Sequence, residues 1–289
     1  MLKGSIVALI TPFKDENLDE ESYIKLINYH LKNGTNGIVP GGTTGESPTL
    51  SHNEHKKIIE IAVKECNSSI PVVAGTGSNS TEEAIELSKF AEKAGSDALL
   101  IVTPYYNKPT QEGLYQHYKK INDNVGIPIV IYNIPSRSVI DMSVETMTKL
   151  YELKNIIGVK DATGDLKRVE LQKKSMGNEF IQLTGNDDNA LEFNQLGGVG
   201  AIGVTANIAA KLSSDFQKAC VEDKNKANEL NKILQPIHAA MFIESNPSPV
   251  KYAASLLNMC SAKVRLPLVE VTEPSKKKIA EALKVAKIL

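Results

Sequence analysis

One lysine of this sequence stands at the end of an otherwise apolar segment. In the stretch IIGVKDATGD, residues 156–165, Lys160 follows small and apolar residues and precedes a turn. The simplest interpretation is a lysine whose ammonium group extends to solvent. If strand alternation instead places Ile156, Gly158 and Lys160 on the inner face of a barrel, burial disfavours the ammonium form and lowers the lysine pKa. A neutral amine can attack a ketone carbon, and Gly158 beneath it would leave room for the substrate.

The segment GGTTGES, residues 41–47, has the composition of an anion-binding loop. It offers closely spaced backbone N–H groups and the hydroxyls of Thr43 and Thr44, just before a helix expected to start near Ser51. This arrangement favours an anion of the size of a carboxylate. The alternative is a tight glycine turn in which both threonines make only local hydrogen bonds.

A third segment, YNIPSRS at residues 132–138, combines a phenol with a guanidinium group. Tyr132 can act as a general acid and base if it lies at the barrel mouth with Thr44 nearby. Arg137 can bind a substrate carboxylate with two parallel hydrogen bonds. The alternatives are a packed strand aromatic for Tyr132 and a surface charge for Arg137.

These candidates need a fold that brings them together, and the apolar segments indicate one. Short apolar runs alternate with amphipathic stretches over about residues 4–222, which gives eight βα units. Such alternation is typical of parallel strands covered by helices, and eight units predict an α/β fold, the (β/α)₈ TIM barrel. The remaining residues carry helical patterns. We therefore expect a catalytic barrel over residues 1–222 and a C-terminal helical region over residues 223–289.

The expected strands are SIVALITPF, GIVPGG, PVVAGTG, DALLIVTPYY, IPIVIYNIP, IIGVKDA, FIQLTGND and VGAIGVT. Active sites of such barrels lie at the C-terminal ends of the strands. The glycine-rich loop, Tyr132 and Lys160 all follow or end expected strands, so we expect them to converge. Helix starts are also marked: Ser51 with Glu54 and Ser80 with Glu83 fit the capping-box pattern. Pro274 suits the first turn of the last helix.

Composition excludes several classes of protein. The chain has 289 residues, 42% hydrophobic and 23% charged, and a formal net charge of −1. It therefore lacks the charge excess that attracts nucleic acid or an anionic membrane. The first apolar run is too short to span a membrane and has no signal-peptide cleavage pattern, so we expect a cytoplasmic protein. An odd number of widely spaced cysteines indicates no disulfide framework: Cys66, Cys220 and Cys260.

Two further motifs do not fit the function that they first suggest. Residues 198–203 read GxGxxG, but they fall in the eighth expected strand rather than in the turn between a first strand and its helix, so we expect no dinucleotide site. His52 and His55 could share one face of a helix. No third ligand is evident, so we expect no metal site.

Taken together, the motifs GGTTGES, YNIPSRS, GVKDATGD, TGND and NPSPVKYA resemble those of the dihydrodipicolinate synthase (4-hydroxy-tetrahydrodipicolinate synthase) family, in the same order and spacing. The resemblance covers essentially the whole chain. It implies a class I aldolase-type lyase in which Lys160 forms a Schiff base with pyruvate, without a separate cofactor. The resulting enamine would attack L-aspartate-4-semialdehyde, a step of diaminopimelate and lysine biosynthesis.

The resemblance also implies roles for the other residues. Thr43 and Thr44 would hold the pyruvate carboxylate, and Arg137 would bind the carboxylate of the aldehyde. Tyr132 would transfer protons, linked through Thr44 to Tyr106 from a neighbouring subunit. The smallest competent unit would then be a dimer, and the family commonly forms homotetramers from two dimers. Two positions would line the pyruvate pocket: Gly185 and Ile202.

Two other functions remain as alternatives. N-acetylneuraminate lyases and keto-deoxy sugar acid aldolases share the lysine and the tyrosine, but they generally lack the PSR sequence that contains Arg137. The second alternative is a catalytically idle barrel that senses an amino acid.

Finally, the family often carries a feedback site for L-lysine at a subunit interface. Glu83 would pair with ammonium groups of the effector, and Pro48 departs from the small residue expected at its position. The matching positions are Ser47, Pro48, His52, His55, Asn79, Glu83 and Tyr105.

Overall fold

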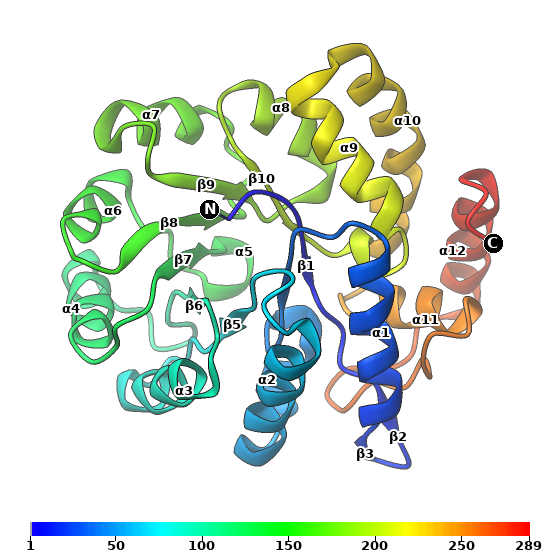
Figure 1. The fold of residues 1–289 in the computed structure, drawn as a ribbon, viewed down its shortest axis with the longest axis horizontal. Helices are drawn as coiled ribbons and strands as arrows, with labels where there is room; N and C mark the ends of the chain where they lie inside the picture. Colours follow the sequence, from blue (N-terminus) through cyan, green and yellow to red (C-terminus); the bar gives the residue numbers. More distant parts are fainter. Residues whose placement is uncertain (1) are drawn as a thin grey trace.

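A closed parallel barrel forms the centre of the molecule (Figure 1). The computed structural model describes residues 2–289, and within them eight parallel strands follow the order β4-β1-β10-β9-β8-β7-β6-β5. The N–H of Gly75 donates to the carbonyl of Pro40 at 2.8 Å, and this bond helps to join the two ends of the sheet. The predicted (β/α)₈ barrel is therefore confirmed. The strands are β1 Gly4–Ala8, β4 Gly37–Val39, β5 Val73–Gly75, β6 Ala98–Val102, β7 Ile129–Asn133, β8 Ile156–Asp161, β9 Ile181–Thr184 and β10 Gly200–Gly203.

Amphipathic helices surround the barrel, and each apolar face packs against the sheet. They are α1 Glu20–Lys32, α2 His52–Cys66, α3 Thr81–Ala94, α4 Gln111–Asn122, α6 Val144–Tyr151, α7 Lys167–Met176, α8 Ala190–Gln195 and α9 Ala210–Glu222. A four-residue helix, α5 Pro135–Ser138, follows β7. A small hairpin that the sequence did not predict, β2 Phe13–Lys14 and β3 Asn17–Leu18, precedes α1. No helix within residues 2–289 has both the length and the apolar character needed to cross a membrane.

The C-terminal region packs onto the barrel as an extension of its core. It consists of α10 Lys224–Met241, α11 Ser248–Leu256 and α12 Glu273–Val285, as predicted for a helical tail. Leu234 of α10 and Leu283 of α12 share one apolar cluster with Leu26 of α1 and Phe216 of α9. The region thus lies along one side of the barrel rather than apart from it (Figure 1).

The capping predictions are confirmed in one helix and half confirmed in another. Ser51 and Glu54 form a complete capping box at the start of α2. Ser80 accepts the N–H of Glu83 at the start of α3, but the carboxylate of Glu83 does not return to Ser80. It contacts His52 instead, at 2.8 Å. Pro274 lies in the first turn of α12, as expected.

A register shift corrects the prediction for the strand that carries Lys160. Ile129 pairs with Ile156, whereas Val130 pairs with Gly158, so one residue of β8 is left over at a bulge. The bulge breaks the alternation, and Ile156 packs in the apolar layer outside the barrel rather than on the face of Lys160. The role expected for Gly158 was also wrong. A Cβ atom there would lie 2.2 Å from the carbonyl oxygen of Ile181, so this glycine permits the close approach of β9 and makes no space for a substrate.

Replacing Gly158 by alanine should destabilise the fold, because the backbone of β9 cannot yield as a flexible side chain would. We expect Gly158→Ala to lower the free energy of unfolding by about 1–3 kcal/mol in urea titrations. Gly42→Ala is the matched control, since its Cβ would meet only Val39 Cγ1 at an ordinary 3.7 Å. Equal stability of the two variants would contradict the role of Gly158 in the close approach of β9.

Candidate active site

Lys160 and Tyr132 lie side by side at the C-terminal ends of neighbouring strands. The two residues are register partners in β8 and β7. The Lys160 Nζ atom lies 4.1 Å from the centre of the Tyr132 ring. Lys160 is only 5% exposed, so its amine does not extend to solvent, and the simplest interpretation of the lysine is wrong.

Burial gives this pair its protonation states. It lowers the pKa of Lys160 to about 7, with the charge of Asp187 opposing the shift and that of Arg137 adding to it. Roughly half of the molecules therefore carry a neutral amine at neutral pH. Burial also raises the pKa of Tyr132 to about 12, although Arg137 and a hydrogen bond with Thr43 lower it in part. The phenol thus keeps its proton and can donate it beside a nucleophilic amine.

Polar side chains on the outer side of β7 and β8 hold the ends of both strands. Asn133 and Asp161, the residues that follow Tyr132 and Lys160, are also register partners. The Asp161 carboxylate accepts a hydrogen bond from Arg168 Nε at 3.0 Å. The Asn133 side chain accepts the N–H of Met142 at 3.0 Å, which closes the loop that carries Arg137. These bonds fix the two catalytic candidates relative to each other.

The glycine-rich segment forms a compact turn rather than an open loop. A short 3₁₀ helix, η1, spans Thr43–Gly45, and Glu46 follows it in the left-handed conformation with φ +56°. Gly41 has φ +68°, and a Cβ atom there would lie 2.5 Å from His55 Nε2. Glycine is therefore required at this close approach.

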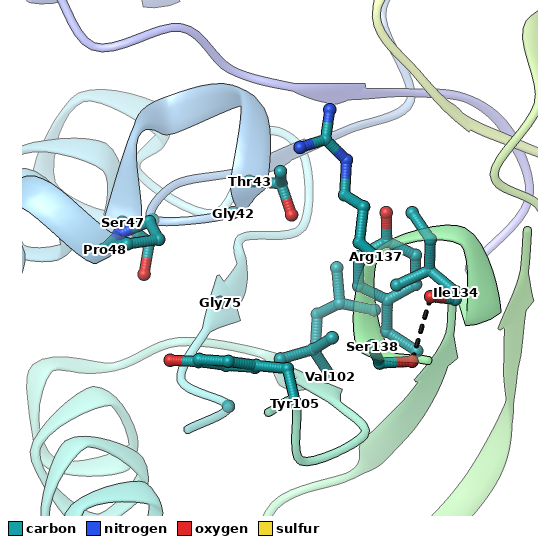
Figure 2. Close-up of a pocket in the computed structure, with 14 residues that line it drawn as sticks. Gly42, Thr43, Ser47, Pro48, Gly75, Val102, Tyr105, Ile134, Arg137 and Ser138 are labelled. Carbon is teal, nitrogen blue, oxygen red and sulfur yellow. Dashed lines mark hydrogen bonds between the residues drawn. The ribbon is translucent and has the colours of Figure 1, made fainter. Parts of the chain in front are cut away.

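A pocket of about 200 Å³ opens above this turn. Figure 2 shows Thr43 on one wall, with Arg137 and Tyr105 entering from two other elements. Tyr132 also lines the pocket, as do Ser47 and Pro48. The hydroxyl of Thr44 is buried and accepts a hydrogen bond from Asn246 Nδ2 at 3.0 Å.

Gly185 directly follows β9, and Ile202 lies in the neighbouring strand β10. The N–H of Gly185 donates to the carbonyl of Asp161 at 2.7 Å. A Cβ atom at Gly185 would lie 3.0 Å from Lys160 Cε, so this glycine, and not Gly158, leaves space beside the lysine. Ile202 is fully buried and belongs to the same interior cluster as Tyr132.

Tyr106 lies apart from the other candidates of its own chain. Its side chain is 89% exposed and its backbone has φ +72°, which is unusual for a tyrosine. Thr44 is bonded to Asn246 rather than to either tyrosine. The expected relay from Tyr132 through Thr44 to Tyr106 is thus not assembled within a single chain.

Two functional candidates were not singled out from the sequence. Asn246 bonds Thr44, and its carbonyl accepts from Arg137 Nη2 at 3.3 Å. Its only signal was its place in the NPSPVKYA motif. Asp187, in the TGND motif, is buried and accepts the N–H groups of Val204 and Thr205 at 2.7 and 2.9 Å.

The residues matching an effector site form two small groups around the same turn. Glu83 contacts His52 and Ser78, and both hydrogen bonds lower the pKa of its carboxyl. The Asn79 side chain donates to the carbonyl of Tyr105 at 3.2 Å. His55 is buried and donates from Nε2 to the carbonyl of Gly75 at 2.7 Å, so it serves the turn itself.

The GxGxxG segment lies within and just before β10, as expected from its position in the eighth strand. A Cβ atom at Gly203 would overlap Asp187 Oδ1, and one at Gly200 would meet the backbone of Gly4. These glycines therefore serve close packing within the barrel. Across residues 2–289, no group of three or more histidine, cysteine, aspartate or glutamate residues could hold a metal ion.

Comparison with known proteins matches this architecture and its motifs. The model of the dihydrodipicolinate synthetase family matches residues 1–286. The chain belongs to this family. A curated relative, the 4-hydroxy-tetrahydrodipicolinate synthase of Pelagibacter ubique (strain HTCC1062), is 70% identical and the match covers 100% of both chains.

Solved structures of this family match the chain over essentially its whole length. The chloride inhibited dihydrodipicolinate synthase from Acinetobacter baumannii, complexed with pyruvate, is 45% identical with a TM-score of 0.98, and the match covers 100% of both chains. The enzyme from Cyanidioschyzon merolae with lysine bound is 33% identical with a TM-score of 0.96, and the match covers 99% of both chains.

Proposed function

We propose that this protein condenses pyruvate with L-aspartate-4-semialdehyde to give 4-hydroxy-tetrahydrodipicolinate, in diaminopimelate and lysine biosynthesis. The observation that carries the proposal is the buried amine of Lys160, whose pKa is about 7 and which lies against Tyr132. The family and the curated relative's name support the choice of reaction. The reaction is that of a lyase and takes place in the cytoplasm.

The first half of the reaction forms the Schiff base. The neutral Lys160 amine attacks the keto carbon of pyruvate to give a carbinolamine, and water then leaves as the imine forms. Tyr132 donates the proton that the departing hydroxyl needs. Thr43 and Thr44 hold the pyruvate carboxylate, with backbone N–H groups of the turn. No separate cofactor takes part, because the protonated imine formed between Lys160 and pyruvate is the electron sink.

The second half forms the carbon–carbon bond. Loss of a methyl proton converts the imine into an enamine, whose methylene carbon attacks the aldehyde carbon. Arg137 binds the carboxylate of the aldehyde substrate at the pocket wall. The amino group of the same substrate then replaces Lys160 on the imine carbon, which closes the ring and frees the lysine. Gly185 and Ile202 line the pyruvate subsite.

Tyr106 completes the proton relay from a neighbouring subunit. Its exposed side chain and unusual backbone support this role, because such a tyrosine gains a partner only when another chain covers it. The competent unit is then a homodimer, and two dimers form a tetramer. The link between Tyr132 and Tyr106 was expected at Thr44, but Thr44 bonds Asn246 whereas Thr43 bonds Tyr132, so we assign the link to Thr43.

The choice of aldehyde tests the proposal. L-aspartate-4-semialdehyde should accelerate pyruvate consumption, whereas N-acetylmannosamine and other sugar aldehydes should not. The opposite preference would support a sugar acid aldolase instead, and imine formation without any turnover would support an amino-acid sensor.

Arg137→Ala should separate the two substrates. We expect kcat/KM for the aldehyde to fall about 10- to 100-fold, the loss of hydrogen bonds to a charged group. Imine formation with pyruvate should change far less at pH 8.5, which lies above the pKa of about 7 of the Lys160 amine. Arg137→Lys is the control, since it keeps the charge and loses the two-pronged geometry. Equal losses in both steps would remove the role assigned to Arg137.

We further propose that L-lysine binds beside Ser47, Pro48, His52, His55, Asn79, Glu83 and Tyr105. An ammonium group of lysine would compete with His52 for the Glu83 carboxylate, and the lysine-bound relative supports an effector of this kind.

Millimolar L-lysine should therefore inhibit turnover. Glu83→Gln should raise the concentration for half-inhibition about tenfold or more, because a charged hydrogen bond is lost. Glu86→Gln is the control, as Glu86 pairs only with Lys56 on the surface. Full activity in millimolar L-lysine would count against the site.

A further inference from the structure

The most deeply buried ion pair of the described residues takes no part in the steps above. Lys251 Nζ lies 2.7 Å from Glu46 Oε1, and both side chains are completely buried. The same ammonium group donates to the carbonyl of Thr11 at 2.8 Å and lies 4.2 Å from the centre of the Phe13 ring. The two charged residues are 205 positions apart in the chain.

The pair lies directly behind the turn that carries the two threonines. Glu46 follows η1 and holds the left-handed conformation, which a residue other than glycine adopts only at some cost. Its second carboxylate oxygen accepts the N–H of Arg265 at 2.9 Å. The Glu46 carboxylate therefore receives donors from two places in the C-terminal region, Lys251 and Arg265.

The same turn is held at each neighbouring residue. Asn246 donates to the hydroxyl of Thr44, and Thr11 donates to the carbonyl of Gly45 at 2.7 Å. Three consecutive residues thus have long-range partners, and those of Thr44 and Glu46 come from the C-terminal region. Such a set of bonds determines the position of the turn more tightly than its own short helix can.

Stability alone is a weak reason for a pair of this kind. Removing two charges from water costs about as much as their attraction returns, and apolar residues of similar volume often serve stability as well or better. A buried pair that also fixes a turn in an unfavourable backbone conformation has a geometric role instead. Geometry matters here because displacements of about 1 Å in a binding group can cost about 100-fold in rate.

We propose that Lys251 is a positioning residue, which holds Glu46 and thereby fixes Thr43 and Thr44 for the carboxylate of the keto acid. The C-terminal helical region then completes the substrate-binding site of the barrel. This inference rests on the proposed function, because it assigns the carboxylate of pyruvate to the turn. It predicts a defect that is larger in keto acid binding than in the use of the aldehyde.

Two variants separate positioning from stability. Lys251→Met leaves the Glu46 charge unpaired and should lower the melting temperature. The double variant Lys251→Met with Glu46→Gln removes that charge and should recover much of the melting temperature. Both should need about 10- to 100-fold more pyruvate for half-maximal imine trapping by borohydride. At saturating pyruvate, KM for the aldehyde should stay within about threefold of wild type.

Leu283→Ala is the control for general destabilisation of the C-terminal region. Leu283 is fully buried in α12, in an apolar cluster that includes none of residues 41–47, so the variant should melt earlier while the pyruvate concentration for half-saturation stays unchanged. If the pyruvate concentration for half-maximal trapping rises wherever the melting temperature falls, in all three variants, the positioning role is overturned. A double variant that needs no more pyruvate than wild type for half-maximal trapping would overturn it as well. A wild-type protein that traps no pyruvate would overturn the proposed function and this inference with it.

Discussion

Desolvation of the Lys160 amine is the constraint on which the other features of the site depend. A lysine in water has a pKa near 10.4 and is neutral in about one molecule in a few thousand at pH 7. Inside the barrel the pKa falls to about 7, which raises the neutral fraction about a thousandfold. The closed barrel supplies this burial, and Gly185 leaves the amine enough space to remain a nucleophile.

A neutral amine creates a second requirement, because it cannot also hold the negative charge of the substrate. The carboxylate needs donors of its own, and the turn with Thr43 and Thr44 supplies them without adding a charge. Arg137 adds a positive charge at the pocket wall, where it attracts a carboxylate and further disfavours the ammonium form of Lys160. The positions of these groups then depend on partners far away in the chain, above all Asn246 and Lys251.

Much of this arrangement could be predicted from local sequence patterns. Apolar runs alternating with helices predicted the barrel, and barrel geometry predicted that the ends of its strands would meet. The bulge at residues 156–158 could not be predicted, because it belongs to the pairing of β8 with β7 and not to either strand alone. Likewise, the carboxylate of Glu83 bonds His52 of a neighbouring helix instead of completing the capping box of its own helix. Asn246 and Lys251 act across more than 200 residues, a separation that no local pattern encodes.

The pH dependence of covalent capture tests the central claim most directly. Wild-type protein is mixed with pyruvate at a series of pH values, reduced briefly with borohydride, digested and mapped by mass spectrometry. The account predicts a pyruvate adduct on the peptide that contains Lys160, with an initial rate that rises with pH and levels off above a midpoint near 7. An adduct on another lysine, or a rate that continues to rise towards pH 10, would contradict it.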